Sequence, residues 1–161
     1  MAATTELRKL NVTTGLATTK QAQKAKQSWA APGWLAGIPR GAVIEIRGSH
    51  SAEWFIEFLK LNPELGVFWA DRTHQAISLR RVMQSELFEV LLAPNKYNDM
   101  KTLQALQIFA EKSNTTLFLF SVDNRISVLP ITLQLEITKT VHDRFRVHSL
   151  VADEIRELFE L

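Results

Sequence analysis

The sequence predicts an α/β fold in which helices flank a mainly parallel sheet, with an antiparallel hairpin near the C-terminal end. Short apolar, β-branched runs alternate with amphipathic segments between residues 42 and 122, an order typical of right-handed parallel sheets. Residues 131–141 then change to a two-residue apolar period, the pattern of an antiparallel strand. A chain of 161 residues, 46% of them hydrophobic, is long enough to bury one such core.

The composition excludes several classes of protein. The chain has no cysteine, so it forms no disulfide, has no thiolate nucleophile and builds no cysteine-based zinc site. No apolar run approaches the roughly 18 residues that a membrane span needs. The initial segment MAATTELRKL lacks the apolar block of a secretory signal. We therefore expect a cytoplasmic protein that makes no use of a membrane.

The N-terminal part is expected to be a basic arm and helix over residues 1–36, ahead of a core over residues 37–161. Residues 19–31 consist of helix formers and stop before Pro32 and Gly33, which predicts a helix, and residues 34–41 are expected to form a turn. The basic residues suit an acidic partner or nucleic acid, or simply a solvated face. In residues 1–40 there are six of them against the single acid Glu6, namely Arg8, Lys9, Lys20, Lys24, Lys26 and Arg40.

The remaining elements follow in order along the chain. We expect strands at residues 42–46, 66–70, 88–93 and 115–122, and helices at residues 52–61, 77–84 and 99–113. Residues 131–141 and 143–150 should pair as a hairpin. A final helix over residues 151–161 would place Val151, Ile155, Leu158 and Phe159 on one side.

The loop after the first core strand has the layout of a phosphate-binding loop without its chemistry. A P-loop reads G-x-x-x-x-G-K-[ST], where glycines admit the phosphate, lysine contacts it and the hydroxyl holds magnesium. Here Gly48 is followed by Ser49, His50 and Ser51, and then Glu53, Trp54 and Phe55 occupy the glycine, lysine and hydroxyl positions. We therefore expect no catalytic residue, no bound cofactor and no metal site. His50 remains either an anion contact or a loop residue without a role.

The run GIPRGAVIEIRG, residues 37–48, resembles the beginning of the core of the RecA-like superfamily. The run VFWADRTHQAISLRRVM, residues 67–83, is similar to the family's second strand and following helix, with Asp71 at the acidic position or serving as a turn residue. Residues 37–148 then correspond to a shortened RecA-like core. The resemblance implies a parallel sheet with a degenerate Walker A loop.

RecA-like chains that keep the GIPRG turn and lose Walker A resemble two groups of the bacterial SOS response. ImuA proteins are accessories of ImuB-type polymerases in translesion synthesis, and SulA proteins inhibit the division protein FtsZ. The long GIPRGAVIEIRG match favours ImuA, whereas the small size favours SulA. The resemblance implies a non-catalytic interaction module whose partner is an ImuB-type polymerase, RecA or FtsZ. The alternative comes from a different functional class: a residual nucleotide-binding ATPase.

Three groups of residues are candidate contacts. In residues 142–148, His142, Arg144, Arg146 and His148 lie on one face and form a basic stripe, extended by Lys139, while the other face carries Val141, Asp143, Phe145 and Val147. The stripe suits DNA or an acidic partner, or protects an edge strand from aggregation. Lys20, Lys24 and Lys26 are expected to face outward, while Trp29 and Trp34 pack on the body or on a second copy in a homo-oligomer. The run QSELF resembles a sliding-clamp motif through Gln84, Leu87 and Phe88, although the last two also suit a core.

Overall fold

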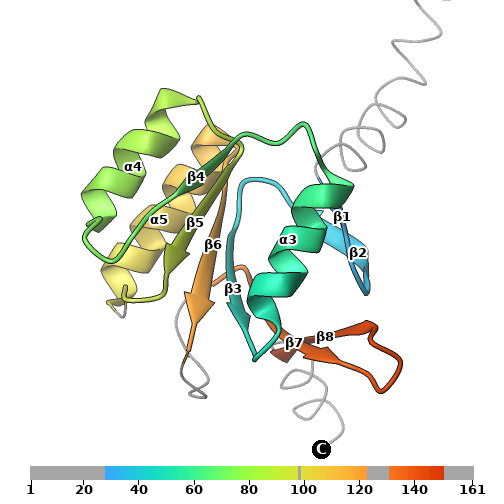
Figure 1. Ribbon diagram of the computed structural model, residues 1–161. Coiled ribbons are helices and arrows are strands. Elements are labelled where there is room, and N and C mark those ends of the chain that lie inside the picture. The colour runs from blue at the N-terminus through green and yellow to red at the C-terminus, as the bar shows by residue number, and fades with distance from the viewer. Residues whose placement is uncertain (1–27, 98, 123–130, 151–161) are drawn as a thin grey trace, which may run out of the picture.

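The computed structural model describes residues 28–97, 99–122 and 131–150 (Figure 1). They form a six-stranded sheet of order β4-β5-β6-β3-β7-β8 and a separate hairpin β1-β2. The large sheet contains β3 (Val43–Arg47), β4 (Val67–Trp69), β5 (Val90–Pro94), β6 (Thr116–Ser121), β7 (Leu133–Lys139) and β8 (Phe145–Ser149). Its neighbouring strands are parallel except for the antiparallel pair β7-β8. The predicted fold class is therefore confirmed.

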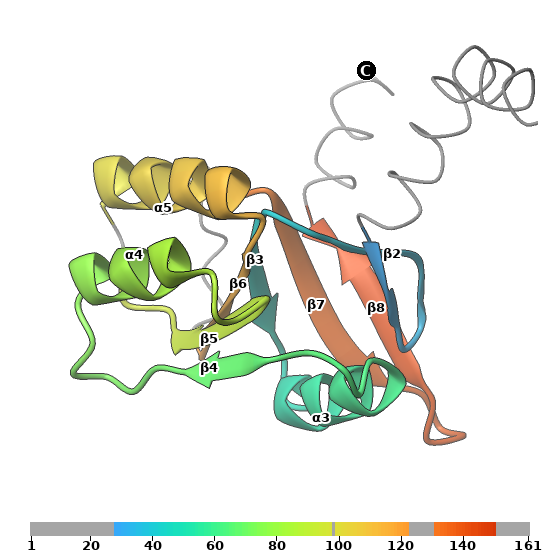
Figure 2. The ribbon, with the colours of Figure 1, turned by 90° about the horizontal axis from the view of Figure 1, so that it is seen from above.

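Helices cover both faces of the sheet (Figure 2). The helices are α3 (Ser51–Leu61), α4 (Ala76–Ser85) and α5 (Met100–Ser113). Figure 2 shows α4 and α5 together on one face and α3 on the other. One buried cluster joins Trp54, Phe55 and Phe58 of α3 to Ile44 and Ile46 of β3. A second cluster packs α4 and α5 against the opposite face. Because β3 is buried on both faces, every residue in it is buried.

Local signals explain where the helices begin and end. The side chain of Asp99 accepts a hydrogen bond from the Thr102 backbone amide at 3.1 Å and caps the first turn of α5. Asn114 ends that helix in the left-handed region, with φ of 53°. The apolar positions of α3 recur at helical spacing, which gives the helix one continuous buried face. The predicted core elements are therefore present, with boundaries that differ by a few residues.

The N-terminal prediction was wrong for residues 28–31. They form strand β1 (Ser28–Ala31), which pairs antiparallel with β2 (Trp34–Pro39) across the turn at Pro32 and Gly33. Residues 34–39 are thus a strand rather than a turn, and the expected domain boundary at residues 36 and 37 falls inside β2. The cause is tertiary burial, because Trp29 and its partner Ile38 are both buried against the α3 side of the core.

Both tryptophans of this segment pack on the body of the protein. Trp29 is buried and meets the ring of Phe58 edge to face, while Trp34 is partly buried against the same cluster. The expected outward positions of Lys20, Lys24 and Lys26, and the expected helix over residues 151–161, lie outside the described residues. Within the described ranges, no helix is long and apolar enough to cross a membrane.

Candidate functional site

The loop that follows β3 occupies the place where open α/β sheets bind ligands. β3 lies between β6 and β7, and its carboxyl end leads through Gly48 into α3. Ligands of such folds bind in crevices outside the carboxyl ends of the strands. A pocket of about 330 Å³ opens there, lined by Arg47, Gly48, Ser49, Ser51, Phe120, Ser121 and Val122. The chain therefore has a crevice at the place where open α/β sheets bind nucleotides.

The side chains at the lysine and hydroxyl positions of a P-loop belong to the hydrophobic core. Trp54 is fully buried and stacks on Phe58, with ring centroids 5.6 Å apart and planes inclined by 7°. Phe55 is also buried and meets Phe118 edge to face at 5.2 Å. Trp54 donates from Nε1 to the Pro32 carbonyl oxygen at 2.7 Å, which ties α3 to the β1-β2 turn. Neither side chain lines the pocket that opens after β3.

Glu53, at the second glycine position, is held by an ion pair. Its Oε2 lies 2.6 Å from Lys139 Nζ, and its Oε1 lies 3.5 Å from His50 Nδ1. The hydrogen bond from Lys139, followed by that from His50, lowers the pKa of Glu53. The carboxylate is therefore ionised at neutral pH, which opposes the binding of a polyphosphate at this turn.

Gly48 is needed for packing. Its φ is 112°, and a Cβ atom placed there would overlap the carbonyl oxygen of Ile137 in β7. The backbone of the loop is closed by a bond from the Trp54 amide to the His50 carbonyl oxygen at 3.0 Å. The close approach of β7 therefore explains the glycine without a phosphate.

The cation nearest to the crevice is also neutralised. Arg47 Nε donates to Glu45 Oε1 at 2.8 Å, and its Nη2 contacts the same oxygen. Both side chains are buried, Glu45 in the middle of β3 and Arg47 at its carboxyl end. A buried cation that is already paired with a carboxylate contributes little to anion binding.

Asp71 acts as a turn residue after β4. Its Oδ1 accepts from the Thr73 backbone amide at 2.8 Å and from the Thr73 hydroxyl, and lies 2.9 Å from His74 Nδ1. These bonds, above all that of the Thr73 hydroxyl, lower the pKa of Asp71 to about 2. Asp71 also borders an apolar pocket of about 390 Å³ beside α3, lined by Ala52, Phe55, Ile56, Trp69, Asp71, Arg72, Leu92, Ala93, Pro94 and Phe120.

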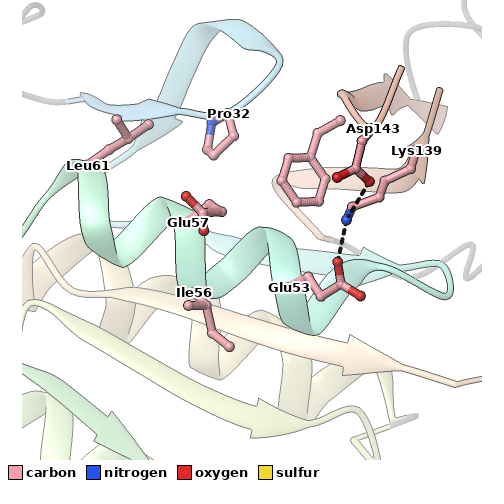
Figure 3. Close-up of a pocket in the computed structure, with 8 residues that line it drawn as sticks. Pro32, Glu53, Ile56, Glu57, Leu61, Lys139 and Asp143 are labelled. Atoms are coloured by element: carbon pink, nitrogen blue, oxygen red, sulfur yellow. Dashed lines mark ion pairs between the residues drawn. The ribbon is translucent and has the colours of Figure 1, made fainter. Parts of the chain in front are cut away.

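A groove of about 500 Å³ runs along the outer side of α3 (Figure 3). We call it the α3 groove; it is lined by Pro32, Glu53, Ile56, Glu57, Leu61, Lys139, Asp143 and Phe145. Lys139 reaches between Glu53 and Asp143, whose Oδ1 is 3.1 Å from its ammonium group. Residues far apart in the sequence build this groove, so no local motif indicated it.

The basic stripe is partly as predicted. Arg144, Arg146 and His148 are exposed, and β8 is an edge strand of the described sheet. Lys139 does not extend the stripe, because it pairs with Phe145 across the hairpin and shares the opposite face. Its ammonium lies 5.2 Å from the Phe145 ring centroid. His142 lies in the turn before the strand.

The clamp-like residues divide between surface and core. Gln84 and Leu87 are exposed at the end of α4 and just beyond it, whereas Phe88 is half-buried and packs against Phe68 with ring centroids 5.4 Å apart. The suggestion that Leu87 belongs to the core is therefore wrong. Elsewhere in the described ranges, no three histidine, cysteine or acidic side chains are grouped to hold a metal ion.

No protein-family model matches the chain, and no curated protein matches it significantly.

Proposed function

We propose that this chain is a non-catalytic interaction module with a RecA-like core, which acts in the bacterial DNA-damage response by protein contact. The burial of Trp54 and Phe55 at the lysine and hydroxyl positions carries the proposal. Phosphoryl transfer depends on a positioned cation and a metal ligand at these places. Losing one such electrostatic contact costs on the order of 10²–10³ in rate. An ionised Glu53 at the same turn adds repulsion.

The proposed partner is an ImuB-type polymerase, with the chain as an ImuA-like accessory of translesion synthesis. This choice rests on the extended likeness of GIPRGAVIEIRG to RecA-like chains that lack Walker A. The exposed arginines Arg144 and Arg146 supply a surface for an acidic partner or for DNA. The small size of the chain favours the second candidate, a SulA-like inhibitor that binds FtsZ.

Two measurements test this function. Titration calorimetry with ATP and magnesium should give no binding heat, and micromolar binding would overturn the non-catalytic assignment in favour of a residual ATPase. Purified tagged chain should then retain an ImuB-type polymerase but neither RecA nor FtsZ. Retention of FtsZ alone would replace the translesion assignment by the SulA-like one.

A further inference from the structure

The α3 groove offers apolar side chains that the described fold leaves uncovered. Ile56 and Leu61 of α3 line the groove and are about half exposed, and Pro32 of the β1-β2 turn and Phe145 of the β7-β8 hairpin line it as well. Figure 3 shows Pro32 on the side of α3 that carries Glu57, whereas Ile56 points away from Pro32. Clustered exposed apolar residues with a polar rim are typical of interaction surfaces. The groove therefore has the walls of a docking site.

The groove presents a negative charge to a binding partner. Among the described residues that line the groove, Lys139 is the one cation, and its side chain is only 21% exposed. The carboxylates of Glu53, Glu57 and Asp143 are 55%, 44% and 85% exposed. Lys60 bonds to Glu57 at 2.8 Å from outside the groove, but an exposed pair of this kind contributes little. The solvent-facing surface of the groove therefore complements a cation.

The groove is also preorganised. The ammonium of Lys139 joins α3 to the β7-β8 turn through Glu53 and Asp143, and the bond from Trp54 to Pro32 fixes the opposite wall. A site that is already ordered loses little conformational entropy when a partner binds.

We propose that the α3 groove binds a segment of a partner protein that presents a lysine or arginine beside a leucine or an aromatic residue. The apolar side chain lies against Leu61 and Phe145, and the cation lies near Glu57. This inference rests on the proposed function as a contact module, and it assigns the groove, rather than the crevice after β3, as the surface for a basic partner.

The test uses the full chain and two labelled synthetic peptides with leucine at helical spacing, one carrying lysine and the other glutamate. Fluorescence anisotropy should show binding of the lysine peptide alone, weakened by added salt. Glu57→Lys and Leu61→Ser should each weaken it by about tenfold or more, as truncation of a central contact does. The matched changes Glu111→Lys and Ile108→Ser, on the exposed side of α5, should leave binding unchanged.

Three results would overturn the inference. The first is equal binding of the lysine and glutamate peptides, and the second is binding of the lysine peptide that survives Glu57→Lys. The third is that the lysine peptide binds neither the natural chain nor a variant in which Lys20, Lys24 and Lys26 are changed to glutamate. Binding seen only in that triple variant would assign the groove to the chain's own basic segment instead of a partner. None of these results depends on ATP, so failure here is separate from failure of the non-catalytic assignment.

Discussion

The indole of Trp54 in α3 donates a hydrogen bond to the carbonyl oxygen of Pro32, 2.7 Å away in the turn between β1 and β2. This bond joins α3, at the position where an NTPase carries its lysine, to the β1-β2 turn. The side chain at this position is therefore part of the framework of the fold.

Placing a lysine at the P-loop lysine position should damage the fold without creating nucleotide binding. Trp54→Lys puts an ammonium in a fully buried aromatic cluster, so we expect the free energy of unfolding to fall by at least about 3 kcal/mol. Chemical denaturation measures this, and calorimetry should still detect no ATP binding. Trp69→Lys is the control, since Trp69 is largely exposed and its replacement should change stability by less than about 0.5 kcal/mol. Equal stability of both variants would contradict the assigned role of Trp54.

Replacing the loop glycine should lower stability through backbone strain. In Gly48→Ala, the positive φ and the overlap with the Ile137 carbonyl oxygen should together cost about 2 kcal/mol or more. Gly66→Ala is the matched change, because the only close approach of its added Cβ is to the end of the flexible Glu89 side chain, its backbone neighbours lie at ordinary contact distance, and its φ is not positive. Urea unfolding of the two variants compares them directly. A Gly48→Ala protein as stable as Gly66→Ala would show that β7 is free to move away.

Asp71 should make stability depend on pH in the acid range. Its pKa is about 2 in the folded chain against an ordinary 3.8, so its ionised form is favoured by folding. The contribution is complete above about pH 4 and is lost as the pH falls towards 2. The melting temperature of the natural chain should therefore exceed that of Asp71→Asn at pH 6, and the difference should shrink below pH 4. Thr73→Val, which removes the strongest bond to Asp71, should move that loss to higher pH. A constant difference would show that the turn bonds do not favour the carboxylate.

Reversing the stripe should weaken partner binding while the fold survives. Arg144→Glu with Arg146→Glu changes two exposed side chains, one just before the edge strand β8 and one within it, so circular dichroism and melting should stay unchanged. Affinity for the polymerase partner or for DNA should fall most at low salt, where charge attraction is least screened. The control is Arg81→Glu with Lys101→Glu, which reverses two exposed charges on α4 and α5. Natural affinity in the stripe variant, for both partners, would mean that the arginines only protect the edge.

The strand and helix order of the core was predictable because its signals are local. Val43–Arg47 and Thr116–Ser121 are short runs rich in β-branched, leucine or phenylalanine residues and bounded by turn residues, and α5 combines an amphipathic period with an N-terminal Asp99. The change of residues 131–150 to a period of two likewise predicted the hairpin and the exposure of Arg144 and Arg146. That Trp54 occupies the P-loop lysine position could also be read from the sequence alone.

What the sequence did not determine depends on contacts between distant residues. Ser28–Ala31 has helix-forming neighbours, but burial of Trp29 against Phe58 makes it a strand. Lys139 was expected to extend the basic stripe, yet pairing with Phe145 turns it towards Glu53. The α3 groove is likewise assembled from the β1-β2 turn, α3 and the β7-β8 hairpin. By itself the sequence determined the elements of the core from β3 onward, because periodicity acts over a few residues. The tertiary structure alone decided which faces are buried and which charges meet, because those depend on residues brought together by folding.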